Sequence, residues 1–222
     1  MTMEYGSRKA VAILLIRSGE RALDVGCHDG VFGKLLLKRG YFSEVYGVDL
    51  DEPCLQIARE NGLVATRLDL NDGRLPYPDC YFDTVTCLDV MEHLIYPLSV
   101  LKEIHRVLKE NGNVIVSTPN VGCGYHVIRL LLGKPLRTSF GEDREDWNQP
   151  DGGHLHYYTF FDLRRTLNHA CFVRLQERAT YNTRSKFISA SLRILARTVL
   201  RSFFCPGIVM VARKSNSVSL RP

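Results

Sequence analysis

The sequence predicts an α/β fold, a three-layer αβα sandwich built around a seven-stranded, mostly parallel sheet. Short apolar runs alternate regularly with helical patterns, and this alternation is typical of right-handed strand–helix–strand units. The chain has 222 residues, 45% of them hydrophobic and 24% charged, a composition that suits a globular domain with a sizeable core. No apolar run approaches the roughly 20 residues of a membrane-spanning helix. We therefore expect a single domain over residues 1–222.

The first half of the chain alternates strands and helices as this fold requires. We expect strands at 21–26, 44–50 and 63–70, separated by helices at 31–39 and 52–61. Gly40 and Gly62 follow the two helices, where glycine commonly ends a helix, and Pro53 lies in the first turn of the second. The apolar segment Ala10–Ile16 has no small-residue cleavage site after it. We interpret it as a helix that packs on the domain and not as a signal peptide.

The second half continues the pattern and then departs from it. Expected strands cover 82–88, 113–117, 172–179 and 208–212, and expected helices cover 97–109 and about 159–170. Thr159 and Asp162 resemble a capping box at the start of the second helix. Residues 133–158 form an irregular stretch far longer than ordinary loops. The sheet is therefore predicted to carry an insertion after its fifth strand, with a lid that includes Trp147 and the charged run 142–146.

Charge and cysteine usage exclude several classes of protein. The formal net charge is +5, but eight basic residues and no acidic one lie in 181–222. This local excess is weak evidence for nucleic-acid binding, which we do not expect. The seven cysteines form no CxxC pair, which disfavours a zinc ribbon or a disulfide framework and suits a reducing cytoplasm. Cys123 has no helper motif beside it, so we interpret it as a small loop residue and not as a nucleophile.

The strongest motif lies at the end of the first strand, where open α/β sheets bind ligands. The run Leu23–Gly33 reads LDVGCHDGVFG, with glycines at 26, 30 and 33. That spacing matches the dinucleotide fingerprint G-x-G-x-x-G poorly. The segment from Asp24 to Gly30 instead resembles the acidic-x-G-x-G-x-G motif of class I S-adenosylmethionine-dependent methyltransferases, with His28 in place of one glycine.

The resemblance to this family continues, in order, from residue 21 to residue 120. Val48-Asp49 and Asp69-Leu70 are placed like the ends of the family's second and third strands, and 82–88 (FDTVTCL) is similar to its fourth. The segment 101–112 looks like the helix and turn that lead to its fifth strand. The segments 118–120 and 154–159 resemble the type 11/12 branch that includes ubiquinone-biosynthesis methyltransferases. The resemblance implies a Rossmann-like fold with a cofactor-binding core at 20–120 and a lid and acceptor region at 121–171.

The resemblance also implies the cofactor, S-adenosyl-L-methionine, which leaves as S-adenosyl-L-homocysteine. Ten residues are expected to bind it: Asp24, Gly26, Cys27, His28, Gly30, Asp49, Leu50, Asp69, Leu70 and Leu88. Asp49 is placed to accept hydrogen bonds from two ribose hydroxyls, and Asp69 from the adenine amino group. Leu50 and Leu70 can sandwich the adenine ring. Asp24 can orient the loop or receive the ammonium group of the cofactor.

His28 is the departure from the family pattern, and two conformations of it are open. Histidine is one of the residues enriched at positive φ, so the turn can keep its shape at a cost of roughly 1–2 kcal/mol. Alternatively, His28 takes a negative φ and its ring covers the edge of the cofactor. A tolerated substitution is favoured over a catalytic role.

Candidate catalytic residues stand after the fourth strand and in the insertion. His93 could accept a proton, since the ordinary histidine pKa lies near neutrality; packing at a helix entry is an equally weighted alternative. His154 and His156 alternate before Tyr157 and Tyr158, and an extended chain would place 154, 156 and 158 on one face around an acceptor. Two histidines without a carboxylate-rich ligand set disfavour a metal site, so none is predicted.

Residues 185–204 are predicted to form an amphipathic basic helix. Ile188, Leu192, Leu195, Val199 and Phe203 share one helical face opposite Arg193, Arg197 and Arg201. Such a helix can lie on an anionic membrane, but packing on the domain is favoured because a strand-like run follows directly. We therefore expect a cytoplasmic protein with, at most, weak peripheral membrane contact, and its oligomeric state stays open.

The function that these patterns favour is methyl transfer from S-adenosylmethionine to a small-molecule acceptor, with oxygen as the acceptor atom. One alternative is a non-catalytic S-adenosylmethionine-binding module that docks a protein or membrane partner. Another is a dehydrogenase with a degenerate glycine loop. Tight binding of S-adenosylhomocysteine without binding of NADH would exclude the dehydrogenase.

Overall fold

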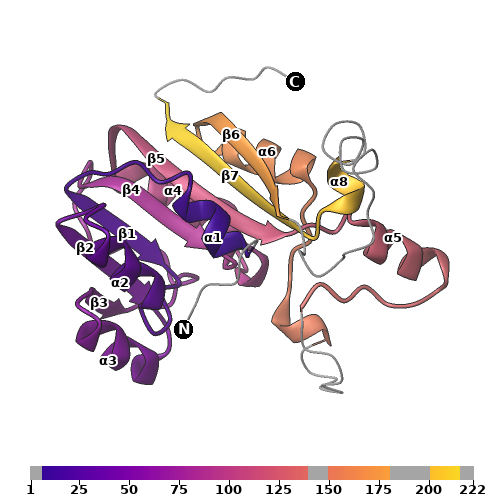
Figure 1. Cartoon of the computed structure of the whole chain (residues 1–222), viewed down its shortest axis with the longest axis horizontal. Coiled ribbons are helices and arrows are strands. Elements are labelled where there is room, and N and C mark those ends of the chain that lie inside the picture. Colours follow the sequence, from indigo (N-terminus) through magenta and orange to yellow (C-terminus); the bar gives the residue numbers. More distant parts are fainter. Residues whose placement is uncertain (1–6, 140–149, 181–200, 216–222) are drawn as a thin grey trace.

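The computed structural model describes residues 7–139, 150–180 and 201–215 (Figure 1). Within these residues, a seven-stranded sheet has the strand order β3-β2-β1-β4-β5-β7-β6 and lies between two layers of helices. The strands are β1 (Arg21–Val25), β2 (Glu44–Asp49), β3 (Val64–Arg67), β4 (Phe82–Leu88), β5 (Leu108–Pro119), β6 (Phe172–Thr180) and β7 (Gly207–Lys214). The prediction of a three-layer αβα sandwich is confirmed.

The sheet reverses its strand order at one point, between β1 and β4. Strands β3, β2, β1, β4 and β5 run parallel to one another, whereas β7 pairs antiparallel with both β5 and β6. The chain moves outward from β1 through β2 to β3 and then returns to place β4 on the other side of β1. The loops that leave β1 and β4 therefore diverge, and α/β sheets bind ligands in the crevice this creates.

Three of the helices, α1, α3 and α6, begin at a residue whose side chain caps them. They are α1 (Arg8–Ile13), α2 (Val31–Lys38), α3 (Glu52–Glu60), α4 (Pro97–Val107), α5 (Gly124–Leu131), α6 (Phe160–His169) and α8 (Arg201–Phe204), with 3-10 turns η1 (Met91–His93) and η2 (Pro150–Gly153). The Asp51 carboxylate accepts the N–H of Cys54 at the start of α3. Thr159 and Asp162 form the predicted capping box of α6. Each cap satisfies donors that a helix end leaves unpaired.

The core consists of one apolar layer on each face of the sheet. Helices α1, α2 and α3 bury side chains such as Leu36 and Leu55 against one face, which includes Ile115 of β5. Helices α4 and α6 bury side chains such as Ile104 and Leu163 against the other, which includes Val114 and Val116. Successive residues of β5 thus point to opposite layers, the period of two that a strand buried on both faces requires.

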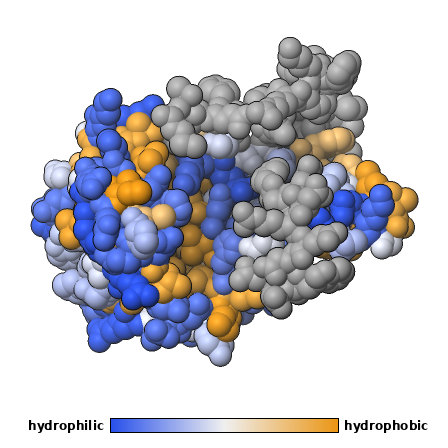
Figure 2. All heavy atoms as spheres, turned by 90° about the horizontal axis from the view of Figure 1, so that it is seen from below, coloured by the Kyte–Doolittle hydropathy of each residue, from blue (hydrophilic) through white to orange (hydrophobic). Residues whose placement is uncertain are grey.

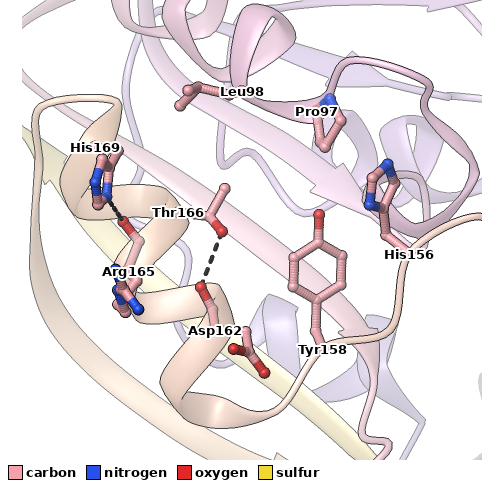
Figure 3. A pocket seen from close by; sticks show the side chains of 8 residues that line it. All are labelled: Pro97, Leu98, His156, Tyr158, Asp162, Arg165, Thr166 and His169. Atoms are coloured by element: carbon pink, nitrogen blue, oxygen red, sulfur yellow. Dashed lines mark hydrogen bonds between the residues drawn. The ribbon is translucent and has the colours of Figure 1, made fainter.

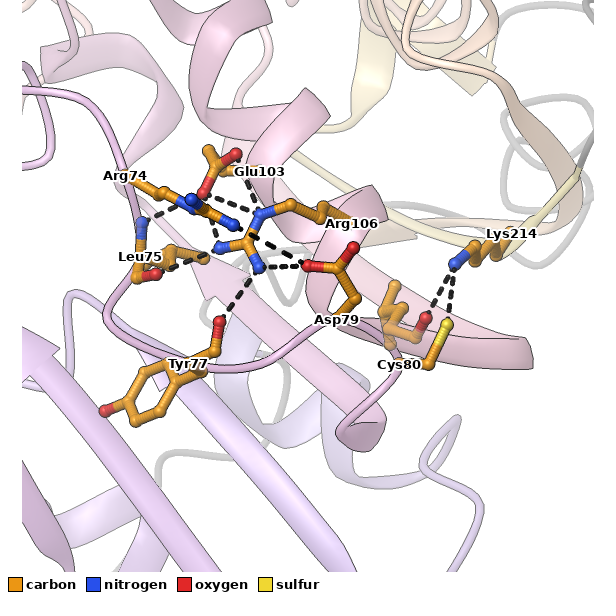
Figure 4. A network of polar contacts seen from close by, with 9 residues as sticks. Arg74, Leu75, Tyr77, Asp79, Cys80, Glu103, Arg106 and Lys214 are labelled. Atoms are coloured by element: carbon orange, nitrogen blue, oxygen red, sulfur yellow. Dashed lines mark hydrogen bonds and ion pairs between the residues drawn. The ribbon is translucent and has the colours of Figure 1, made fainter.

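Arg106 of α4 fixes the connection between β3 and β4 to the helix layer (Figure 4). Its guanidinium donates to the carbonyl oxygens of Leu75 (2.9 Å) and Tyr77 (2.8 Å) and to the carboxylates of Glu103 and Asp79 (both 2.7 Å). The planar guanidinium can satisfy several acceptors at once because its donors have fixed directions. This clamp gives the long connection a defined path into the start of β4, at the edge of the sheet opposite the crevice.

Several predicted boundaries are wrong, and one helix was not foreseen. Strand β3 is shorter than 63–70, and β5 is longer than 113–117 because the chain from Leu108 is already extended. The helix α5 lies in the predicted lid and acceptor region, before the irregular stretch 133–158, in a segment for which no element was predicted. The predicted lid segment 142–147 and most of the predicted basic helix at 185–204 lie outside the described residues. Within the part of the chain that is described, no helix is both long and apolar enough to cross a membrane.

Candidate active site

The turn from β1 into α2 has the left-handed backbone that a glycine-rich cofactor loop needs. Gly26, His28 and Gly30 have φ angles of 72°, 48° and 70°. A Cβ on Gly26 would lie 2.3 Å from Cγ2 of Val90. The loop therefore lies directly against Val90, just after the end of β4. The N–H groups of Gly26 and Cys27 both donate to the carbonyl of Val48 (2.8 and 3.1 Å). The loop is therefore fixed to β2 before any ligand binds.

His28 adopts the positive-φ conformation of the two that the sequence left open. Its side chain is 65% exposed, and its Nε2 lies 3.3 Å from Sγ of Cys54 in the first turn of α3. Its backbone N–H donates to Oδ2 of Asp49 at 2.8 Å. The left-handed turn therefore aims a backbone donor at the carboxylate that was predicted to bind ribose, and the ring contacts α3.

The carboxylates predicted to bind the cofactor lie at the ends of β2 and β3. Asp49 accepts a hydrogen bond on each oxygen, from His28 and from the N–H of Asp51 at 3.1 Å. Each carboxylate oxygen can accept more than one bond, so both keep capacity for a ligand. Asp69 accepts from the N–H and the side-chain amide of Asn71 (2.9 and 3.1 Å). Both side chains are oriented by short local bonds.

Three apolar residues predicted to contact the cofactor differ in burial. Leu50 is 54% exposed beside Asp49, so its side chain keeps apolar surface that a ligand can cover. Leu70 is partly buried against the layer that contains α4. Leu88, the last residue of β4, is buried. Leu50 and Leu70 thus keep surface that can contact a flat ring, whereas Leu88 packs in the apolar layer on the face covered by α1, α2 and α3.

Asp24 is a buried carboxylate at the switch point of the sheet. It is 4% exposed, and the Thr86 hydroxyl of β4 donates to its Oδ1 at 2.6 Å. Burial raises the pKa of Asp24 to about 6, while the Thr86 hydrogen bond and Lys9 oppose that rise. Asp24 can therefore carry a negative charge at neutral pH beneath the cofactor loop. That charge suits an ammonium group.

The side chain of Cys27 is not placed like the other predicted cofactor residues. Its Sγ would lie 2.6 Å from a Cβ on Gly47, within the apolar layer on the α1–α3 face. Burial, followed by the charges of Asp24 and Asp49, raises the pKa of Cys27 to about 12. The thiol is therefore protonated and belongs to the core. The expectation that Cys27 contributes a ligand contact has no support from its side chain.

A second group of polar residues lies beyond the end of β4. Three of them, Asp89, Arg8 and Ser117, were not predicted from the sequence. Asp89 has a φ of 61° and accepts on Oδ1 from Arg8 of α1 (2.5 Å) and from the Ser117 hydroxyl of β5 (2.6 Å). The three residues come from elements far apart in the sequence, so no local motif could have revealed them.

Glu92 is the most buried carboxyl of this group. Its residue is 1% exposed, and its Oε2 has no hydrogen-bond partner within the described part of the chain. Burial, reinforced by Asp89, raises the pKa of Glu92 to about 8. The backbone carbonyl of Glu92 accepts the N–H groups of Leu155 and His156 (2.7 and 3.1 Å), which fixes the insertion to η1. A protonated carboxyl therefore lies next to the predicted catalytic segment.

His93 and His154 meet across this contact. Their rings pack edge to face with centroids 4.6 Å apart, and Nδ1 of His93 lies 3.3 Å from the carbonyl of Gly153. Nδ1 of His154 lies 2.6 Å from the Thr138 hydroxyl, which in turn donates to Asp151 at 2.7 Å. Thr138 and Asp151 were also missed, because residues 140–149 separate them in the sequence. Two of the three predicted catalytic histidines are thus brought together.

His156 lies elsewhere, in a groove between the start of α4 and one side of α6 (Figure 3). The groove has a volume of about 380 Å³ and is lined by Pro97, Leu98, His156, Tyr158, Asp162, Arg165, Thr166 and His169. The rings of His156 and Tyr158 lie 6.3 Å apart. The expected single face of residues 154, 156 and 158 is therefore wrong for His154, which contacts His93 and Thr138 instead.

The described residues contain one group of side chains that could share a cation. A carboxylate oxygen of Glu92 and one ring nitrogen each of His93 and His154 lie within 4.8 Å of one another. Carboxylate and imidazole ligands suit several divalent metals. No metal was predicted from the sequence, and that expectation stays a prediction.

Apolar side chains are exposed on α5 beside this region. Ile128, Leu130, Leu131 and Leu132 are each at least half exposed, and they gather at the end of the molecule that α5 occupies (Figure 2). Arg129 lies among them in the sequence, and Lys134 follows them. This surface lies in the insertion and not in the cofactor-binding half of the sheet.

Comparison with known proteins gives consistent results. A model of a methyltransferase domain matches residues 3–176. A ubiquinone biosynthesis O-methyltransferase of Alkalilimnicola ehrlichii is 33% identical over 136 residues, 59% of this chain and 54% of that protein. The enzyme of the same name from Pseudomonas aeruginosa is 33% identical over 108 residues, 46% of each. The chain thus spans about half the length of the curated relatives it matches.

Solved structures agree on the fold. An S-adenosylmethionine-dependent methyltransferase from Mesorhizobium loti superposes with a TM-score of 0.66 at 21% identity, covering 94% of this chain and 99% of that one. Identity at this level supports the architecture of the sheet and its helices, and it leaves the choice of acceptor to the residues of this chain.

Proposed function

The chain belongs to the methyltransferase-domain family, and we propose that it transfers a methyl group from S-adenosylmethionine to an oxygen of a small-molecule acceptor. The observation that carries this proposal is the set of strand-end groups around the switch point of the sheet. A preformed glycine loop, the Asp49 carboxylate and the exposed Leu50 lie on one side, and a buried polar group lies on the other. The curated relatives, named as O-methyltransferases, support oxygen as the acceptor atom.

The residues of the loop and strand ends fit the cofactor. Asp49 would accept from the ribose hydroxyls, and Asp69 from the adenine amino group, with Leu50 and Leu70 against the ring. Asp24 would carry the charge that balances the cofactor's ammonium group. The cofactor supplies a methyl group activated by a sulfonium, so the protein has mainly to align the acceptor with that methyl group and exclude water.

The acceptor would lie between the cofactor loop and the pair formed by His93 and His154. An aliphatic or phenolic hydroxyl must lose a proton as it is methylated, and a neutral histidine within reach can accept that proton. Burial lowers the pKa of His154, and the nearby His93 lowers it further, which keeps the ring neutral around pH 7. His156 would contact the acceptor from the groove of Figure 3.

A non-catalytic module that only binds S-adenosylmethionine is less well supported. Such a module needs the cofactor side of the site but has no use for a buried carboxyl beside two packed histidines, which is costly to maintain. A peripheral membrane contact through 186–204 stays a prediction from its sequence. Flotation with vesicles of anionic lipid would test it separately from catalysis.

The direct test of the function is transfer of a labelled methyl group. The purified chain is incubated with methyl-labelled S-adenosylmethionine and a panel of small phenols and alcohols, and label is followed into product. We expect transfer to at least one hydroxyl compound, with an equal amount of S-adenosylhomocysteine. Binding of S-adenosylhomocysteine without transfer to any acceptor would favour the non-catalytic module.

A further inference from the structure

We propose that Thr138 and Asp151 hold His154 in the tautomer that carries its proton on Nδ1, so that the Nε2 lone pair is free to act on the acceptor. This inference rests on the proposed function for its meaning in catalysis. Its physical content is a hydrogen-bonded chain from a buried carboxylate, through a hydroxyl, to an imidazole. Asp151 and Thr138 are positioning residues in this arrangement, since they act through His154.

The chain begins with Asp151, which is held in its ionised form. Its Oδ1 accepts the N–H groups of Thr138 (2.6 Å) and Ser139 (2.8 Å) and the Ser139 hydroxyl (3.0 Å). Burial is the largest influence on the pKa of Asp151 and raises it, but these donors together hold the pKa below its usual range. An ionised carboxylate has no hydrogen to give, so Asp151 can only accept.

The hydroxyl of Thr138 comes next, and it has a single hydrogen. Its Oγ lies 2.7 Å from Oδ2 of Asp151 and 2.6 Å from Nδ1 of His154. Because Asp151 cannot donate, the hydroxyl gives its hydrogen to Asp151 and must accept one from Nδ1. The direct distance from His154 Nδ1 to Asp151 Oδ2 is 3.7 Å, too long for a hydrogen bond. The hydroxyl therefore connects the two groups.

The same reasoning fixes the state of the far nitrogen. A neutral imidazole carries one N–H, and the partner of one nitrogen decides which tautomer is present. With Nδ1 protonated, Nε2 of His154 carries a lone pair. The ring of His93 is held similarly, since its Nδ1 faces the carbonyl of Gly153 at 3.3 Å. Both packed histidines then carry an unprotonated Nε2.

The contacts are buried enough to be specific. The side chains of His154 and Asp151 are 6% and 2% exposed, and Thr138 is also buried. Water therefore competes little for these hydrogen bonds, which strengthens them. If Asp151 served only to hold residues 138 and 139 in place, the N–H groups of Thr138 and Ser139 and the Ser139 hydroxyl would be sufficient. The contact between the Thr138 hydroxyl and the imidazole of His154 would then have no purpose.

Nitrogen-15 NMR of the histidine rings tests the tautomer without any need for activity. The spectra are recorded on the full chain at neutral pH with a metal chelator, and the His154 signals are assigned with His154→Gln. The informative variant is Thr138→Val, which keeps the shape of the side chain and removes the hydroxyl. Thr138→Ser retains the hydroxyl and should keep the wild-type tautomer of His154. Ser139→Ala is the matched control, because it removes one hydrogen bond to Asp151 and leaves the hydrogen bonds from Asp151 through Thr138 to His154 intact.

We expect wild-type His154 to show a protonated Nδ1 and an unprotonated Nε2, with the same pattern in T138S and S139A. In T138V the pattern should become a mixture of tautomers, and kcat should fall about tenfold or more while KM changes less than about twofold. A wild-type His154 protonated on Nε2, or a T138V variant that retains the wild-type pattern, would overturn the proposal. If no acceptor is methylated at all, the proposed function fails while the NMR result still decides the tautomer.

Discussion

Arg8 and Asp89 are 81 residues apart in the sequence, yet the Nε of Arg8 donates to Oδ1 of Asp89 at 2.5 Å. Their side chains are 15% and 30% exposed, and Asp89 is held in a left-handed conformation at the end of β4. The pair therefore attaches α1 to the mouth of the crevice. It joins the N-terminal helix to the strand end from which the polar side of the site is built.

Removing Arg8 should loosen this side of the site. We expect Arg8→Ala to lower the free energy of unfolding by about 1–3 kcal/mol, because it leaves a partly buried carboxylate without its cation. Urea denaturation measures the loss. Glu52→Gln, which removes an exposed ion pair with Arg59, should cost clearly less stability than Arg8→Ala, because exposed ion pairs contribute little. Equal losses in the two variants would show that the Arg8–Asp89 pair is no more than a surface interaction.

Replacing His28 by glycine tests whether the histidine is only tolerated. Glycine removes the strain of a side chain at positive φ but adds freedom to the unfolded chain, so stability should change by less than about 1 kcal/mol. Affinity for S-adenosylhomocysteine, measured by calorimetry, should stay within about twofold or rise. Cys54→Ala removes the other end of the ring contact and should behave alike. A loss of more than tenfold in His28→Gly would show that the ring contributes to binding.

The titration of Asp24 should affect folding stability and cofactor affinity in opposite directions as the pH rises. Its pKa is raised to about 6 in the folded protein, above the unfolded value of about 4. The folded state therefore holds its proton more tightly, so stability is lost as the pH rises from about 4 to about 6. Cofactor binding needs the ionised form, so affinity for S-adenosylhomocysteine should fall as the pH drops through about 6.

Thr86→Val should move this midpoint to higher pH, because the Thr86 hydroxyl donates to Asp24 and stabilises its charge. Thr84→Val is the matched control, since Thr84 is a buried threonine of the same strand. Calorimetric titrations between pH 5 and 8 locate the midpoint in each protein. An unchanged midpoint in Thr86→Val would rule out Asp24 as the group that titrates.

The cofactor side of the site was predictable because its residues are local in sequence. Gly26, Gly30 and Asp49 stand at strand ends that apolar patterns reveal, and parallel strands bring those ends to one edge. The acceptor side was only partly predictable. Thr138 and Asp151 flank the segment 140–149, and Arg8 reaches Asp89 from a separate helix. Such pairs depend on tertiary contacts and leave no periodic signal in the sequence.

The burial of individual side chains was the other limit. Cys27 stands within the motif, yet its side chain packs against Gly47 of β2. Because glycine has no side chain, there is room at that position for the thiol. The α5 helix was missed because its apolar residues face outward, so its pattern does not mark a core face. His154 and His156 alternate as expected of one face, but the contacts of each with different elements separate them.

The central claim, that the strand-end carboxylates form an S-adenosylmethionine site, is tested most directly by calorimetric titration with S-adenosylhomocysteine. We expect binding to the wild-type chain, no binding of NADH, and at least a tenfold loss in Asp49→Asn, since the amide removes charge and acceptor capacity toward the ribose. Asp51→Ala, which removes the cap of α3 two residues away, should cost about 1 kcal/mol of stability and leave the affinity within about threefold. Wild-type affinity in Asp49→Asn, or no binding to the wild-type chain, would contradict the account.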